Sequence, residues 1–134
     1  ADHGFVDVPA ERMVHMDDHP GLSDCLSLPL CGEPRTAYCY VKPGRQEQFE
    51  SYVNSELAEQ MSLFASQELI DQGLFGPGPI HPQLAHRVGD YTLLLKENYM
   101  IKDTLPGEHD FELIGMHGGL SAEELYVPLV YAAT

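Results

Sequence analysis

The hydrophobic pattern predicts three strands in the middle of the chain. Residues 36–42 are rich in aromatic and β-branched side chains and end at Pro43-Gly44, a pair typical of turns. Residues 91–96 and 99–103 have the same character. Only two residues connect these last two strands, so the pattern predicts a hairpin.

From Arg45 the apolar positions change to helical spacing. Phe49, Val53, Leu57 and Met61 are four residues apart and share one face of a helix. This stripe predicts an amphipathic helix that packs on a sheet.

Shorter elements are predicted toward the two ends. Residues 63–65 predict a short strand, after which Ser66 can cap a helix of one or two turns. Residues 121–124 have the form of a capping box and predict a second short helix, and residues 128–132 predict a last strand. The first thirty residues have turn chemistry and little periodicity, so we expect connecting segments there. Helices that interrupt strands indicate an α/β or α+β fold.

Composition narrows the functional classes. The chain has 134 residues, 43% of them hydrophobic, which suits one globular domain. Seven Lys and Arg against 21 Asp and Glu give a net charge of -14, and such a field repels nucleic acids and anionic membrane surfaces. The longest apolar run falls well short of the roughly 18 residues that a spanning helix needs.

The three cysteines, Cys25, Cys31 and Cys39, cannot all pair, and their spacing lacks the close pairs of a zinc knuckle. Cys39 lies in a predicted strand and is interpreted as a small buried hydrophobic residue. A reducing, cytoplasmic location fits these unpaired cysteines best. A secreted or periplasmic parent protein that has lost its signal peptide stays open.

Candidate chemistry begins at the start of the chain. Asp2 places a carboxylate beside the imidazole of His3, and Gly4 can take the positive φ of a sharp turn. Both side chains can reach one ion only where the strand breaks into such a turn. Zinc and manganese accept this mixture of oxygen and nitrogen ligands. The alternative is a polar chain end in solvent.

A second candidate lies near the other end. His117 stands between Gly115 and Gly118-Gly119, so the backbone can approach a ligand closely there. The alternative is a turn histidine without a ligand. A third cluster, of His15, Asp17, Asp18 and His19, is interpreted as a solvated turn because Pro20-Gly21 follows it.

A resemblance to a known family connects the two candidate segments at the ends of the chain. Residues 1–9 resemble the metal-binding segment of the alkaline phosphatase superfamily, in the branch of type I phosphodiesterases and nucleotide pyrophosphatases. Phe5 departs from that pattern, where the family often has methionine. Four later segments resemble, in the same order, the C-terminal third of bacterial members, and the last is the most specific: residues 32–35, 73–76, 87–90 and 115–129.

The resemblance implies a two-metal hydrolase with an alkaline-phosphatase-like α/β fold. In this family two divalent ions, usually zinc, flank a Thr or Ser nucleophile that attacks phosphorus. Asp2 and His3 match the pair that binds the metal beside the nucleophile, and His117 matches a histidine that binds the other metal. Manganese is the alternative ion.

The resemblance also implies that the chain is the C-terminal part of a larger enzyme, because the family's nucleophile and remaining ligands lie upstream of its Asp-His-Gly motif. We expect residues 1–31 to be the metal-motif segment and a connector. Residues 32–103 would form a small α+β subdomain, and residues 104–134 the histidine loop, a short helix and the last strand. No residue here matches a catalytic nucleophile, so the isolated chain should be inactive.

The expected partners are a small phosphate ester or nucleotide substrate and the rest of the parent chain, with no nucleic acid polymer and no membrane. Two alternatives remain. One is a phosphomonoesterase or phosphonate hydrolase of the same superfamily. The other is a non-catalytic acidic binding or assembly module in which both end motifs are inert.

Overall fold

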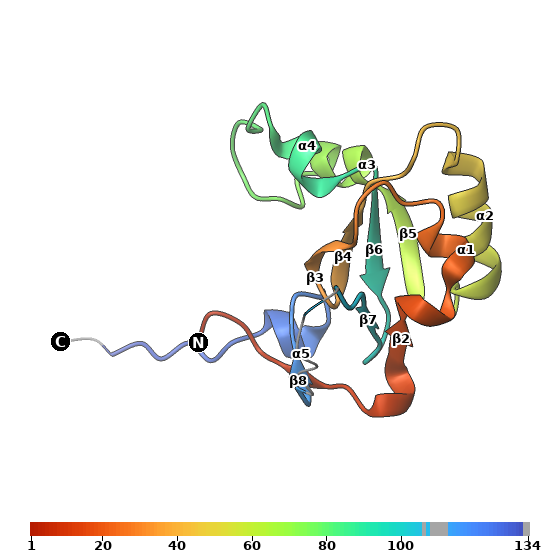
Figure 1. Cartoon of the computed structure of the whole chain (residues 1–134). Helices are drawn as coiled ribbons and strands as arrows, with labels where there is room; N and C mark the ends of the chain where they lie inside the picture. The colour runs from red at the N-terminus through yellow and green to blue at the C-terminus, as the bar shows by residue number, and fades with distance from the viewer. Residues whose placement is uncertain (106, 108–112, 133–134) are drawn as a thin grey trace.

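A four-stranded antiparallel sheet forms the centre of the molecule (Figure 1). The structure is a computed structural model that describes residues 1–105, 107 and 113–132. In spatial order the strands of this sheet are β3 (Cys31–Glu33), β4 (Thr36–Cys39), β6 (Tyr91–Leu95) and β5 (Met61–Ala65).

Helices α1 (Pro20–Ser23) and α2 (Gln46–Glu56) contribute to the main core with this sheet. The predicted stripe is confirmed, since Phe49, Val53 and Leu57 are buried. Its fourth member, Met61, is also buried but begins β5. Helices α3 (Ser66–Asp71) and α4 (Leu84–Val88) lie together at one end of the sheet (Figure 1).

Two small sheets tie the chain ends to this body. Strand β1 (Val6–Asp7) pairs antiparallel with β8 (Gly115–Met116), and β2 (Met13–His15) pairs parallel with β7 (Met100–Lys102). The remaining elements are the 3-10 helices η1 (Ala10–Arg12) and η2 (Met16–Asp18) and helix α5 (Ala122–Leu125). A second, smaller core is formed by Val8, Met100 of β7 and Met116 of β8.

The mixed α/β character predicted from the sequence is confirmed, and so are its main strands and helix. Cys39 is fully buried and unpaired, as expected of a small hydrophobic residue. Burial raises the pKa of its thiol far above the ordinary value, so this sulfur stays protonated.

The predicted hairpin between residues 91–96 and 99–103 is wrong. Strand β6 pairs with β4 and β5, whereas β7 leaves the sheet and pairs with β2. The carbonyl groups of Glu97 and Tyr99 accept hydrogen bonds from the Arg35 guanidinium at 2.7 Å and 2.6 Å. This cation therefore binds the turn between the two strands.

Three other expectations are corrected. Ser66 does not cap α3 but donates a hydrogen bond to the carbonyl of Val88, because its side chain is buried between α4 and the sheet. The first thirty residues contain β1, β2 and α1 rather than connections alone. Residues 128–132 form no strand, since no other described segment pairs with them, and they run away from the body (Figure 1).

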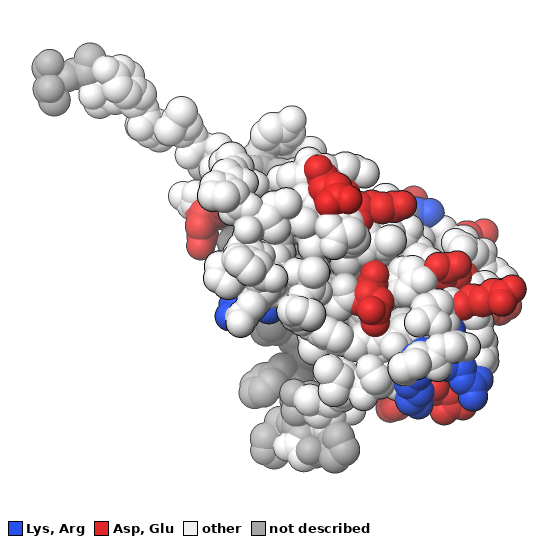
Figure 2. Space-filling view, turned by 90° about the horizontal axis from the view of Figure 1, so that it is seen from above, with Lys and Arg blue, Asp and Glu red and all other residues white. Residues whose placement is uncertain are grey.

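Acidic side chains lie at several places on the face of the molecule seen from above, and basic side chains gather beside some of them at one edge (Figure 2). None of the helices in the described ranges combines the length and the apolar character that crossing a membrane requires.

Candidate functional site

The pairing of β1 with β8 brings the two candidate histidines together. Val6 is opposite Met116 and Asp7 is opposite Gly115, so the segments that carry His3 and His117 run side by side. The two imidazole rings stack with their centroids 4.1 Å apart and 23° between their planes.

Phe5 completes a cluster of three rings at this point. Its ring meets the His3 ring edge-on at 5.0 Å and the His117 ring edge-on at 5.4 Å. An aromatic side chain therefore closes one side of the imidazole pair, at the position where the resembling family often has methionine.

The hydrogen bonding of His3 decides which of its nitrogens can bind a ligand. Nδ1 lies 3.0 Å from the carbonyl oxygen of Gly4, which can only accept, so Nδ1 carries the proton. In the neutral ring the lone pair is then on Nε2. A backbone carbonyl on the other ring nitrogen is the usual way in which a metal-binding histidine is oriented.

Asp2 supplies a second donor beside that nitrogen. Its Oδ2 lies 3.9 Å from Nε2 of His3. Two donors that share a zinc ion at about 2.1 Å each can be at most about 4.2 Å apart, so one cation can lie between these atoms. The backbone N–H of Asp2, the His3 imidazole and the N–H of His3 lower the pKa of the Asp2 carboxyl below its ordinary value.

The carboxylate and imidazole groups are of the types that bind a divalent ion, but there are too few of them to complete a metal site. A carboxylate and neutral imidazoles suit zinc, which generally takes three or more protein ligands at a catalytic site. Within the described ranges no three His, Cys, Asp or Glu side chains are grouped so that they could hold a metal. Asp2, His3 and His117 can therefore supply only part of a metal centre.

Gly4 has a role other than the one expected from the sequence. It does not have a positive φ. A Cβ atom at this position would lie 1.8 Å from the carbonyl oxygen of Glu123, and the Gly4 N–H donates to the carbonyl of Glu124 at 2.9 Å. Glycine is required because the segment packs directly on the backbone of α5.

A buried ion pair supports the histidine loop, and the sequence analysis missed it. Arg35 and Glu124 are 1% and 2% exposed, and the guanidinium donates to both carboxylate oxygens at 2.7 Å and 3.0 Å. The carboxylate also accepts from the N–H of Gly119 at 2.8 Å and of Ser121 at 3.2 Å. The capping box at residues 121–124, which predicted that Glu124 reaches back, is confirmed and was the only local signal.

The surroundings of Glu124 favour its ionised form. Burial by itself raises the pKa of this carboxyl, but the hydrogen bonds from Arg35, Gly119 and Ser121 outweigh it. The net effect is a pKa below the ordinary value.

The glycines after His117 fit the loop against the body of the protein. Gly118 has φ +97° and its Cβ would lie 2.6 Å from the Cβ of Glu33. Its carbonyl accepts a hydrogen bond from the Thr36 hydroxyl at 2.6 Å. Gly118 therefore allows the loop to lie close against β3 and β4.

The cluster at residues 15–19 is not brought to this site. His15 is exposed in β2, and His19 Nδ1 lies 3.0 Å from the hydroxyl of Tyr52 on α2. The sequence predicted no ligand there, although 3-10 helix η2 takes the place of the expected turn.

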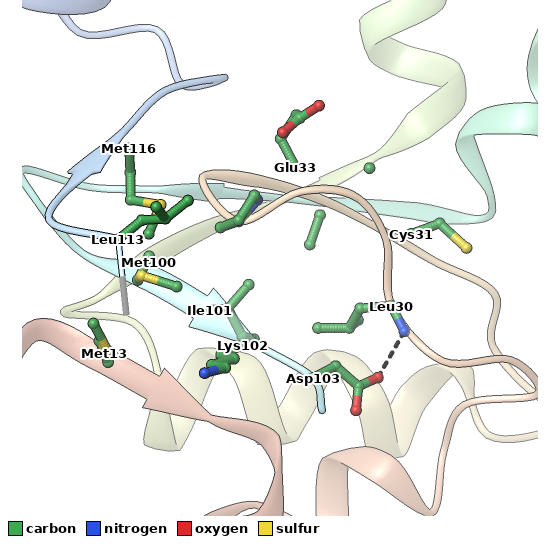
Figure 3. A pocket seen from close by; sticks show the side chains of 13 residues that line it. Met13, Leu30, Cys31, Glu33, Met100, Ile101, Lys102, Asp103, Leu113 and Met116 are labelled. Carbon is green, nitrogen blue, oxygen red and sulfur yellow. Dashed lines mark hydrogen bonds between the residues drawn. The ribbon is translucent and has the colours of Figure 1, made fainter. Parts of the chain in front are cut away.

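A cavity of about 380 Å³ lies elsewhere, between β3, β7 and β8 (Figure 3). Thioether and aliphatic side chains line most of it, including Met13, Met100 and Met116, and Asp103 at its edge accepts the N–H of Leu30 at 2.8 Å. Neither His3 nor His117 lines this cavity, so it is separate from the imidazole pair.

Comparison with known proteins shows similarity in fold. No protein-family model and no curated protein sequence matches this chain. Among solved structures, murine ectonucleotide pyrophosphatase/phosphodiesterase 5 matches with a TM-score of 0.61 at 17% identity, over 93% of this chain. The human protein of the same name matches with a TM-score of 0.64 at 17% identity, over 92% of this chain.

An inactive form of the murine protein in complex with AMP matches with a TM-score of 0.56 at 18% identity, over 92% of this chain. In each case this chain spans 30% of the matched protein's length. The likeness therefore shows a fold related to part of these ectonucleotide pyrophosphatase/phosphodiesterases.

Proposed function

We propose that this chain is the C-terminal portion of a two-metal phosphodiesterase or nucleotide pyrophosphatase that acts on small phosphate esters. Its role is to supply part of the metal ligands. The observation that carries the proposal is the stacking of His3 and His117 at 4.1 Å, since these two residues are far apart in the sequence. The related fold of the ectonucleotide pyrophosphatase/phosphodiesterases supports it, one of which binds AMP.

In this proposal each donor has a distinct task. Asp2 and His3 hold one divalent ion through Oδ2 and Nε2, and His117 holds a second, with zinc favoured and manganese the alternative. Such ions, when bound, stabilise charge on the oxygens of a phosphoryl group. The Gly4 carbonyl keeps the His3 ring turned so that Nε2 faces the Asp2 carboxylate.

Zinc titration of the chain tests the ligand assignment. We expect weak binding, because the donors are incomplete, and a lower affinity after His3→Ala. His81→Ala is the matched control, since His81 is exposed and lies outside the site. Equal zinc affinity in the His3→Ala and His81→Ala variants, measured by calorimetry, would contradict the assignment.

Activity measurements test the proposed role in a longer protein. The isolated chain should not hydrolyse bis(p-nitrophenyl) phosphate with zinc or manganese. In a longer protein that carries this sequence and hydrolyses the ester, His117→Ala should lower kcat/KM by at least about 100-fold, because loss of even an outer partner of a metal ligand costs about 10–100-fold. An unchanged kcat/KM favours the non-catalytic acidic module.

A phosphomonoesterase or phosphonate hydrolase would use the same metal ligands and differ in the substrate it accepts. Comparing rates on a monoester, a diester and a phosphonate in such a longer protein separates these activities. The proposal expects the diester to be the preferred substrate.

A further inference from the structure

Glu124 hydrogen-bonds to both halves of the candidate site through different parts of the residue. Its backbone carbonyl accepts from the N–H of Gly4 at 2.9 Å, and Gly4 directly follows His3. Its carboxylate accepts from the N–H of Gly119 at 2.8 Å, two residues after His117. One residue therefore fixes the backbone beside each imidazole.

Arg35, directly before β4, fixes Glu124 in turn. Its guanidinium donates to both carboxylate oxygens, at 2.7 Å and 3.0 Å. It also donates to the carbonyls of Tyr99 at 2.6 Å and Glu97 at 2.7 Å. A bidentate contact restricts both distance and orientation, so α5 is held in one position relative to the sheet.

The ion pair of Arg35 with Glu124 contributes more to the position of the histidine loop than to the stability of the fold. Both side chains are almost completely buried, at 1% and 2% exposure, and removing two charges from water offsets much of their attraction. Apolar residues of similar volume are often at least as stabilising at such positions. What apolar residues cannot replace is the pair of hydrogen bonds to the N–H groups of Gly119 and Ser121.

We propose that Arg35 and Glu124 are a positioning pair that sets the spacing between the imidazoles of His3 and His117. The inference deepens the proposed function and rests on it only where zinc is used as a probe. The pair acts through the backbone of Gly4 and Gly119 and does not itself bind the ion or the substrate.

Nuclear Overhauser contacts between the two imidazole rings test the positioning directly in the full chain, without metal. The 4.1 Å separation of the ring centroids should give a clear cross-peak. Glu124→Gln should abolish it. Glu97→Gln is the matched control, because it removes the same charge from the exposed Arg12–Glu97 pair, 2.8 Å apart, and should leave the cross-peak intact.

A second variant separates positioning from folding. Arg35→Met combined with Glu124→Leu removes both buried charges, so a folded protein is expected. The cross-peak should be lost while the circular dichroism spectrum stays that of the unaltered chain. A cross-peak of unaltered intensity in this folded variant would overturn the proposal.

Amide hydrogen exchange in the unaltered chain tests the proposal even if the variants do not fold. If one ion pair holds both segments, the amide protons of Gly4 and Gly119 should exchange with solvent in a single opening and be protected to the same degree. Protection of Gly4 together with rapid exchange of Gly119 would refute the proposal.

Zinc affinity then links the pair to the proposed function. Disturbing the partners of metal ligands lowers affinity by about 10–100-fold, so the folded double variant should bind zinc at least about 10-fold more weakly. If the unaltered chain binds no zinc, the proposed function fails, and the ring contacts still decide whether the pair positions the histidines. Equal zinc affinity with and without the pair would refute the positioning role.

Discussion

At the scale of single residues, the Asp-His-Gly motif requires glycine at position 4 because of a close contact and not because of its backbone conformation. Gly4 lies so near the carbonyl of Glu123 that any side chain must displace one of the two segments. Gly115, in β8, is different, because the atoms nearest to a Cβ there belong to the Phe5 side chain, the first of them at an ordinary 3.6 Å.

Gly4→Ala should therefore destabilise the protein by about 1–3 kcal/mol, as overpacking does. Gly115→Ala is the control and should stay within about 0.5 kcal/mol of the unaltered chain. Urea denaturation measures both free energies of unfolding. Similar losses in the two variants would contradict the steric explanation.

The lowered pKa of Glu124 predicts a pH dependence. The folded protein keeps this carboxylate ionised at pH values where the unfolded chain already binds the proton. The stability that the group contributes is therefore complete above its ordinary pKa of about 4.5, and it is lost as the pH falls through the lower pKa of the folded state.

Melting temperatures of the unaltered chain and of Glu124→Gln, measured from neutral pH to pH 3, check this dependence. The unaltered chain should be the more stable at neutral pH, and the difference should shrink below pH 4.5. A difference in melting temperature between the two proteins that stays constant from neutral pH to pH 3 would show that Glu124 does not cause the dependence.

At the scale of elements, β4 supports the histidine loop through one hydroxyl group. Thr36 donates to the carbonyl of Gly118 at 2.6 Å and pairs with Leu94 of β6 and Glu33 of β3. The loop is thus attached to the central sheet at a point separate from the ion pair.

Thr36→Val keeps the shape and the strand preference of this residue and removes only the hydroxyl. The carbonyl of Gly118 loses its partner, so we expect a loss of about 1–3 kcal/mol. Thr104→Val, at an exposed position outside the strands, is the control and should change little. Thermal unfolding of both variants makes the comparison, and an unaffected Thr36→Val would show that the hydroxyl does not hold the loop.

At the scale of the whole molecule, an apolar segment remains uncovered after α5. Leu129, Val130 and Tyr131 are 92%, 90% and 86% exposed, and Tyr126 is 82% exposed. Apolar patches of this kind mark surfaces that associate with other proteins. The net charge of -14 opposes contact between copies of the chain, and this repulsion weakens as salt screens it.

The chain should accordingly self-associate more strongly as the salt concentration rises. Sedimentation velocity at low and high salt measures this, and the double variant Leu129→Asp with Val130→Asp should remain monomeric in both. Leu28→Asp, at an isolated exposed leucine, is the control and should behave as the unaltered chain does. Association that is unaffected by the double variant would locate the contact elsewhere.

Local sequence patterns determined much of this protein. The helix with Phe49 and Val53, the strands around Cys39 and Leu93 and the capping box at Ser121 each follow from periodicity or from residues a few positions apart. Residue types also singled out the Asp-His-Gly segment, and the metal role of the histidine loop was implied by the resemblance to a known family.

Only the tertiary structure decided which segments meet. Strand β7 pairs with β2 instead of with its expected hairpin partner, and Arg35, distant in sequence, donates to the carbonyls of the turn before it. The resemblance implied that His3 and His117 belong to one two-metal centre, but the strand pairing that joins them is seen only in the structure. The ion pair of Arg35 with Glu124 likewise joins segments far apart in the sequence. Contacts between distant segments depend on how the whole chain packs, and that packing leaves no periodic signal at either partner.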